Sequence, residues 1–240
     1  MRLDNYLVEY GYFDSRTKAR QAIDRGEIFL NGKLNTKASY NIDESVEQKI
    51  EYVYENSFVS LGGFKMFKAL TDFDFSVKDF IVVDVGASTG GFTDCLLKSG
   101  ANKVYAVDLN DKLLHPTLAS CDKVIPIIKN AKELTTKDFN DQLDLLVADL
   151  SFISATYVMD VFSALLTSGK FAILLVKPQF ELNERKKFKN GIIRDSKVQN
   201  AALEKVLNCA KNNGFIHLKT TTAPESKDKN LEYLVLLKKQ

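Results

Sequence analysis

The chain of 240 residues contains no tryptophan, four prolines, three cysteines and two histidines. The cysteines stand far apart, so we expect reduced packing residues and not a disulfide framework. Two histidines are too few for a His/Cys zinc cluster, and we expect no metal site. The charges nearly balance, with 33 basic and 31 acidic residues. Affinity for nucleic acid therefore has to come from a local basic surface.

The sequence also lacks a long hydrophobic segment. Its longest apolar runs, such as residues 171–176, are far shorter than the roughly 20 residues that span a bilayer. The N-terminus does not show the basic, apolar and small-residue order of a secretion leader. We therefore expect a soluble, cytoplasmic protein. Its length allows one large domain, or a large and a small one.

The first 55 residues are predicted to form a small α+β domain. Apolar residues at helical spacing predict one helix over residues 3–10 and a second that begins after Ser15 and ends at Gly26. Asn31-Gly32 between short apolar runs predicts a β-hairpin. Basic side chains on the second helix and the hairpin favour contact with RNA phosphates, although acidic neighbours leave a solvated, mixed-charge helix as the alternative. The candidate RNA-binding residues are Arg16, Lys18, Arg20, Arg25, Lys33 and Lys37.

Residues 56–240 alternate strand-like and helix-like segments, which predicts an α/β domain with a Rossmann-like sheet. Seven strands are expected, near residues 81–85, 103–107, 124–128, 143–148, 170–176, 215–222 and 232–238. The connection between the last two strands is too short for a crossover helix. The final strand should therefore run antiparallel in an otherwise parallel sheet.

The segment 82–96 predicts the cofactor site, because an apolar strand ends in a small-residue loop that opens a helix. The next strand ends in Asp108, which is placed to bind ribose hydroxyls. A nicotinamide fingerprint that starts at Gly86 needs a glycine at position 88, which is serine. Asp84, which we expect to face the amino-acid end of the cofactor, is typical of S-adenosylmethionine-dependent methyltransferases. The candidate cofactor-binding residues are Asp84, Gly86, Ala87, Ser88, Gly90, Phe92, Asp108 and Asp149.

Four charged residues stand where a strand ends or a loop meets the cofactor cleft: Lys65, Asp149, Lys177 and Glu232. Asp149 and Lys177 directly follow apolar strands, and ligands bind in open sheets where the carboxyl ends of such strands converge. The alternative is a strand-end ion pair of little consequence. Lys65 taken alone is equally consistent with a solvated lysine.

Five motifs in order resemble the TlyA (hemolysin A) family, over essentially the whole chain. They lie at residues 62–65, 84–92, 148–152, 176–181 and 230–234, and segments 2–4, 15–23 and 30–33 are similar to the S-four-like RNA-binding domain. The resemblance implies an FtsJ-like catalytic domain in which Lys65, Asp149, Lys177 and Glu232 form the methyl-transfer centre. It also implies S-adenosyl-L-methionine as cofactor and the 2′-hydroxyl of a cytidine in ribosomal RNA as acceptor.

Two positions depart from the family pattern, since Leu61 stands in place of an arginine and Asn110 in place of a glycine. The chain is similar to the shorter family form, which is associated with the large ribosomal subunit alone. We expect Lys177 to take the hydroxyl proton, with Lys65 as a neighbouring cation. Two other functions stay open at this point: a small-molecule enzyme on the same fold, and a non-catalytic factor that binds ribosomes or RNA.

Overall fold

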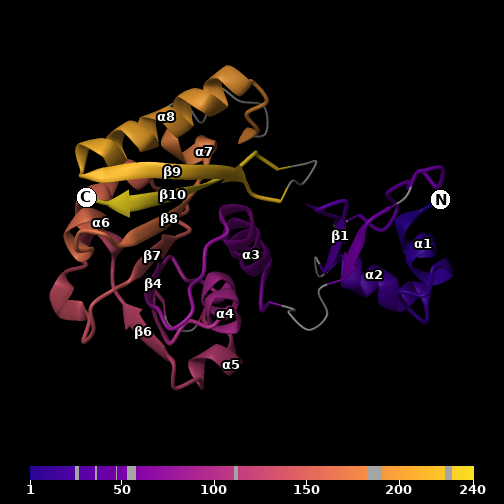
Figure 1. Ribbon diagram of the computed structural model, residues 1–240, viewed down its shortest axis with the longest axis horizontal. Coiled ribbons are helices and arrows are strands. Elements are labelled where there is room, and N and C mark those ends of the chain that lie inside the picture. The colour runs from indigo at the N-terminus through magenta and orange to yellow at the C-terminus, as the bar shows by residue number, and fades with distance from the viewer. Residues whose placement is uncertain are drawn as a thin grey trace.

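The computed structural model describes residues 1–24, 27–35, 37–46, 48–52, 58–110, 113–182, 191–224 and 229–240. The N-terminal elements form one lobe, and a seven-stranded sheet with its helices forms the other (Figure 1). The predicted domain boundary between residues 55 and 56 lies outside the described residues, as do Arg25 and Gly26.

The N-terminal lobe combines two helices with a three-stranded antiparallel sheet of order β2-β1-β3. Its elements are α1 (Leu3–Glu9), α2 (Arg16–Asp24), β1 (Ile28–Leu30), β2 (Lys33–Leu34) and β3 (Ile50–Tyr52). The predicted hairpin is confirmed, because β1 pairs with β2 around Asn31 and Gly32, whose φ angles are 52° and 74°. Positive φ at both central residues is the requirement of a type I′ turn, which matches the twist of the paired strands.

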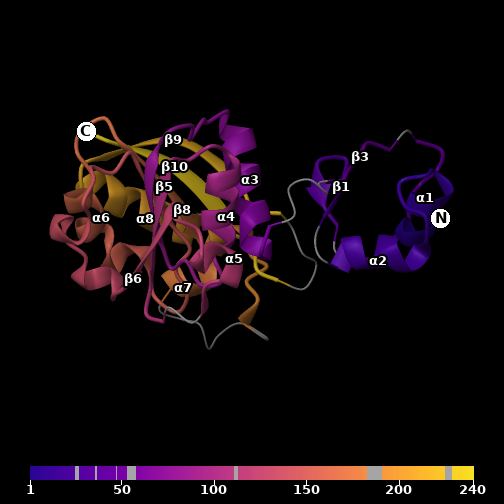
Figure 2. The ribbon, with the colours of Figure 1, turned by 90° about the horizontal axis from the view of Figure 1, so that it is seen from below.

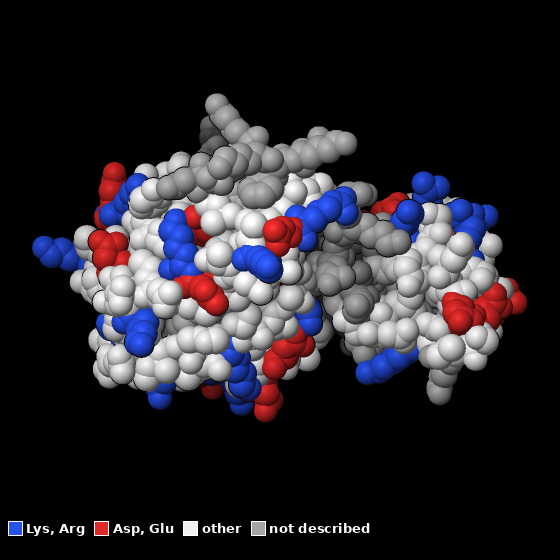
Figure 3. Space-filling model, turned by 90° about the horizontal axis from the view of Figure 1, so that it is seen from above, with Lys and Arg blue, Asp and Glu red and all other residues white. Residues whose placement is uncertain are grey.

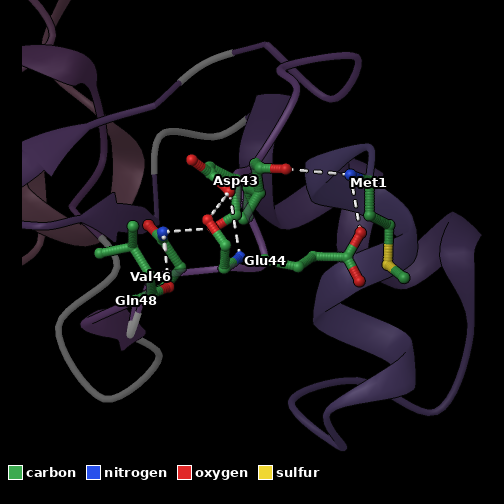
Figure 4. Close-up of polar contacts among 7 residues, drawn as sticks. Met1, Asp43, Glu44, Val46 and Gln48 are labelled. Carbon is green, nitrogen blue, oxygen red and sulfur yellow. Dashed lines mark hydrogen bonds and ion pairs between the residues drawn. The ribbon is translucent and has the colours of Figure 1, made fainter.

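The N-terminal amino group is held by the loop that leads to β3. The Met1 ammonium donates a hydrogen bond to the Ile42 carbonyl at 2.9 Å and forms an ion pair with Glu44 at 2.9 Å (Figure 4). Within the same loop, Gln48 donates to the Asp43 carbonyl at 2.8 Å. These contacts fasten the connection between β2 and β3 to the start of α1.

Strand β1 faces two different neighbours. Ile28 and Leu30 point into the core of the N-terminal lobe, as alternate residues of a strand do. Phe29 lies on the other face and is only 5% exposed, with its ring centroid 6.0 Å from that of Phe64 in α3 (Leu61–Phe73). Phe58 packs edge-on against Phe64 at 5.0 Å. The N-terminal lobe therefore contacts the second lobe through a buried aromatic side chain.

The second lobe is built on a mixed sheet of order β6-β5-β4-β7-β8-β10-β9. The strands are β4 (Ile81–Val85), β5 (Lys103–Asp108), β6 (Val124–Ile128), β7 (Leu145–Ala148), β8 (Phe171–Val176), β9 (Phe215–Thr222) and β10 (Tyr233–Lys239). The predicted seven strands and the antiparallel last strand are confirmed, since β10 pairs antiparallel with both β8 and β9.

Helices cover both faces of this sheet (Figure 2). Helices α3 and α4 (Gly91–Lys98) pack on one face, against alternate strand residues such as Val82 and Leu145. Helices α6 (Met159–Leu165) and α8 (Ser196–Asn212) pack on the other, against residues such as Val83 and Leu146. The remaining short elements are α5 (Pro116–Ala119), α7 (Pro178–Glu181) and 3₁₀ turns at Ala131–Glu133, Thr136–Asp138 and Ala155–Tyr157. In the described part of the chain, no helix is both long enough and apolar enough to cross a membrane.

Candidate active site

The four predicted catalytic residues come from one end of the sheet and the helix beside it. Asp149 follows β7 and Lys177 follows β8, so both lie at the carboxyl ends of parallel strands. Glu232 precedes β10, which runs in the opposite direction and pairs Tyr233 with Val176. An antiparallel strand therefore brings its first residues to the edge where its parallel neighbours end. Lys65 lies on α3.

The structure joins these residues in two ion pairs. Lys65 Nζ lies 2.6 Å from Glu232 Oε2, and Lys177 Nζ lies 2.5 Å from Asp149 Oδ1. Lys177 is only 7% exposed and also donates to Ser151 Oγ at 2.9 Å. The Lys177–Asp149 contact is the strand-end ion pair that the sequence offered as an alternative. That Lys65 acts as a neighbouring cation of Lys177 stays a prediction.

The segment before Lys65 is helical and tightly packed. Gly62 and Gly63 form the first turn of α3, although two adjacent glycines in a sequence are more typical of a flexible turn. A Cβ at Gly63 would lie 2.2 Å from Phe58 Cβ, and a Cβ at Gly91 would lie 2.3 Å from Ser60 Oγ. Gly63 therefore makes room for the Phe58 side chain, and Gly62 and Gly91 allow the first turns of α3 and α4 to approach closely. This packing fixes Lys65 on a rigid element.

The loop after β4 has a backbone shape that restricts side chains. Gly86 has φ +83°, and a Cβ there would lie 2.7 Å from the Asp149 carbonyl oxygen. Gly90 has φ +91° and precedes the first residue of α4. Ser88 has φ 51°, and its amide donates to Asp108 Oδ2 at 2.8 Å. At Gly86, where the loop comes closest to Asp149, the loop therefore presents only backbone atoms.

Asp84 is completely buried and serves an internal contact. Its Oδ2 accepts hydrogen bonds from the Thr93 amide at 3.0 Å and the Thr93 hydroxyl at 2.7 Å, which ties α4 to β4. Burial raises the pKa of Asp84 to about 7, against the opposing effect of the Thr93 hydrogen bond, and the charge of Asp149 adds to the rise. Its Oδ1 has no hydrogen-bond partner in the described part of the protein.

A cleft of about 1480 Å³ opens between the two lobes. Small-molecule sites usually have volumes of about 300–1,000 Å³, so this cleft has room for more than a nucleoside cofactor. The predicted site residues that line it are Lys37, Lys65, Gly86, Ala87, Ser88, Phe92, Asp149 and Glu232. Leu61, the departure from the family pattern in α3, lines it as well. Asp84, Gly90, Asp108 and Lys177 are not part of the lining.

These residues suit S-adenosylmethionine. The Gly86 loop offers backbone to a ligand where a Cβ would not fit, and Asp84 keeps one buried oxygen without a partner. The two carboxylate oxygens of Asp108 accept from the amides of Ser88 and Leu109. Each oxygen has a further lone pair, so the carboxylate can still accept from ribose hydroxyls. Within the described ranges, no group of three or more His, Cys, Asp and Glu side chains is placed to hold a metal ion.

Three of the six candidate RNA-binding residues are ion-paired within the N-terminal lobe. The pairs are Arg16–Asp4 at 2.9 Å, Lys18–Asp14 at 2.8 Å and Arg20–Asp24 at 3.9 Å. Hydrogen bonds from Arg2 and Arg16 lower the pKa of the buried Asp4 to about 2, so Arg16 has a structural partner. Arg25 and the side chain of Lys33 lie outside the described residues.

An aromatic pair next to Lys177, made of the exposed Phe152 and the partly buried Phe180, was not predicted. Phe152 is 81% exposed and has φ 68°, an unusual backbone conformation for a bulky residue. Its ring lies 5.3 Å from that of Phe180, and Lys177 Nζ lies 5.7 Å from the Phe180 ring centroid. The sequence signal is an aromatic residue three positions after each of Asp149 and Lys177. A lone phenylalanine in a sequence is more often part of a core, so this signal was weak.

Comparison with known proteins agrees with this geometry. The model of the FtsJ-like methyltransferase family matches residues 58–240, and that of the S4 domain matches residues 1–47. Hemolysin A of Brachyspira hyodysenteriae is 40% identical over 98% of this chain and 98% of its own. The 16S/23S rRNA (cytidine-2′-O)-methyltransferase TlyA of Mycobacterium tuberculosis is 30% identical over 100% of this chain and 90% of its own. A solved structure from Streptococcus thermophilus, which carries a provisional hemolysin name, is 34% identical with a TM-score of 0.74, covering 100% of this chain and 88% of its own.

The glycine-shaped loop after β4, the acidic end of β5 and the antiparallel last strand define a Rossmann-like methyltransferase whose cofactor is S-adenosylmethionine. The similarity to relatives extends through both lobes. The chain belongs to the FtsJ-like methyltransferase family, and within it to the hemolysin A (TlyA) family, with an S4 domain at its N-terminus.

Proposed function

We propose that this enzyme methylates the ribose 2′-hydroxyl of a cytidine in ribosomal RNA of the large subunit. The observation that carries the proposal is the arrangement of Lys65, Asp149, Lys177 and Glu232 in two ion pairs at the carboxyl edge of the sheet, beside the Gly86 loop. The TlyA relative is named for cytidine-2′-O-methylation of rRNA. The size of the cleft supports a polymeric substrate held next to the cofactor.

In this proposal the protein positions the hydroxyl and removes its proton. When bound, S-adenosylmethionine supplies an electrophilic methyl group on a sulfonium sulfur. Lys177 is the candidate base, since its amine is held by Asp149 and Ser151 at fixed distances. The Lys65–Glu232 pair completes the site, since Glu232 directly precedes Tyr233, the partner of Val176 at the end of β8. Phe152 and Phe180 offer an apolar surface on which a base can stack beside the reacting ribose.

The domain organisation belongs to the same proposal. Residues 1–55 are the RNA-binding domain and residues 56–240 the catalytic domain, and the family matches at 1–47 and 58–240 support this division. Its substrate places the enzyme with ribosomes in the cytoplasm. The N-terminal lobe then binds RNA through those basic residues that can exchange their carboxylate partners for RNA phosphates.

The experiment that tests the function is a map of ribose 2′-O-methylation in ribosomal RNA from cells with and without this protein. We expect one modified cytidine of the large subunit to disappear and to return with the wild-type enzyme. A map that is the same with and without the protein contradicts the proposal. If binding to ribosomes is unchanged and the Lys177→Ala variant restores full function, the protein is a non-catalytic binding factor.

A further inference from the structure

The charges that line the cleft are unevenly balanced. Three carboxylates lie in the lining, and each has a cationic partner: Asp24 pairs with Arg20, Asp149 with Lys177, and Glu232 with Lys65. Three cations in the lining, Lys37, Arg194 and Lys229, form no ion pair in the described part of the chain. Among the described residues, the lining therefore carries more cations than their paired carboxylates compensate, which attracts a polyanion.

Two of these cations lie on neighbouring segments of the catalytic lobe. The Asn230 side chain accepts from the Ile193 amide at 2.7 Å and donates to the Gly191 carbonyl at 2.9 Å. It thus joins the segment that carries Arg194 to the segment that carries Lys229. Glu232, whose carboxylate pairs with Lys65, lies two residues after Asn230. Both cations therefore stand near the start of β10, on the catalytic side of the cleft.

The backbone around Arg194 is fixed on both sides. Ile193 is 2% exposed, and its carbonyl accepts from Gln199 Nε2 at 2.7 Å. Asp195 caps α8 by accepting from the Lys197 amide at 2.8 Å. The exposed Arg194 side chain thus projects from an anchored segment, so binding a phosphate costs little ordering of the backbone. Arginine also matches phosphate geometry through two parallel hydrogen bonds.

We propose that Arg194 and Lys229 bind phosphates of the RNA strand next to the target ribose, opposite Lys37 of the N-terminal lobe. This inference rests on the proposed function, since it assigns a second RNA-binding surface to the catalytic lobe itself. Lysine and arginine side chains are visible on both lobes beside their junction (Figure 3). The RNA strand is then bound from both sides of the cleft. The catalytic lobe positions the reacting nucleotide independently of RNA binding by the N-terminal lobe.

The test compares the Arg194→Ala/Lys229→Ala double variant with the wild-type chain in binding to protein-free large-subunit ribosomal RNA across a salt series. Each lost contact should reduce the slope of log K against log salt by about 0.7–0.9, or about 1.4–1.8 for two contacts. At 0.1 M salt this corresponds to an affinity loss of about 25- to 60-fold. The control is Lys211→Ala, which removes an exposed lysine from the other end of α8 and should change neither value.

Calorimetry with S-adenosylmethionine separates RNA contacts from cofactor contacts, and we expect equal cofactor affinity in the wild type and both variants. The inference is overturned if the double variant and the Lys211→Ala control share the wild-type salt slope. It is also overturned if cofactor affinity falls together with RNA affinity. A different result would contradict the proposed function: the wild-type enzyme would bind this RNA with the expected salt slope but methylate no ribose in it.

Discussion

Replacing Lys177 with alanine should remove the proton acceptor of the reaction and leave the cofactor site in place. Lys177 is 7% exposed, lies 2.5 Å from Asp149 and donates to Ser151 at 2.9 Å. Neither contact is with the Gly86 loop or with Asp108, the candidate cofactor-binding groups at the ends of β4 and β5. We therefore expect a loss of about two to four orders of magnitude in the methylation rate, the usual contribution of a positioned general base.

The same substitution has a smaller effect on stability. It leaves the Asp149 carboxylate without its cation, which costs about 3–5 kcal/mol when a pair is fully buried. The Asp149 side chain retains 22% exposure, so water replaces part of the lost interaction. We expect the free energy of unfolding to fall by about 1–2 kcal/mol, which leaves the variant folded at assay temperature.

The assay is single-turnover methylation of ribosomal RNA at saturating enzyme, with cofactor affinity measured by calorimetry. The matched control is Lys170→Ala, which breaks a 2.6 Å pair with Asp144 at the opposite end of β8 and should keep the full rate. Lys177→Arg preserves the charge but cannot accept a proton, so it should lose nearly as much activity as the alanine variant. Near-full activity of the arginine variant would show that Lys177 acts through its charge, and the base assignment would be wrong.

Three further predictions concern the loop and the two lobes. Gly86→Ala should lower cofactor affinity and destabilise the domain by about 1–3 kcal/mol, because the residue needs a positive φ; unchanged cofactor calorimetry and unchanged thermal unfolding would refute this. The pKa of Asp84 is about 7 in the fold and 3.8 in the reference state, so folding binds a proton and stability falls as pH rises from about 4 to 7. Asp84→Asn should lack this fall, giving a stability gain over wild type that grows by up to about 4 kcal/mol across that range in denaturant titrations; a gain independent of pH would exclude it. Arg16→Ala should mainly destabilise the N-terminal lobe, by about 1 kcal/mol through its pair with Asp4, whereas Arg20→Ala should flatten the salt dependence of RNA binding with little change in stability; the reverse pattern would exchange their roles.

The sequence predicted the sheet well because its strands are unusually clear. Short, near-continuous apolar runs such as residues 171–176, in a chain that alternates strand and helix patterns, indicate strands buried on both faces, and the short connection before β10 requires an antiparallel partner. The hairpin at Asn31-Gly32 was predicted because asparagine and glycine both tolerate the positive φ angles that a type I′ turn requires. The helical start of α3 was missed, because two adjacent glycines indicate a turn until the packing partners Phe58 and Ser60 are known.

The sequence brought the four charged residues to one site and offered the Asp149–Lys177 ion pair as an alternative, but it did not predict the pairing of Lys65 with Glu232. The ends of β7 and β8 follow from apolar periodicity, whereas the partner of each lysine depends on tertiary distances that the sequence does not contain. For the same reason the sequence did not predict the ion pair of Arg16 with the buried Asp4, which lies in another helix. Asp84 could not be assigned to an internal contact without the position of Thr93.

The contact between Phe29 and Phe64 has a practical consequence for dissecting the protein. Phe64 is 1% exposed in the intact chain. Removal of the N-terminal lobe would remove the Phe29 ring that packs against Phe64 and would leave an apolar patch on the surface of α3. A catalytic fragment made by truncation would then tend to self-associate, and its loss of activity would be misattributed to missing RNA contacts. Point substitutions in the intact chain, or a fragment whose exposed phenylalanine is replaced by a polar residue, avoid this confusion.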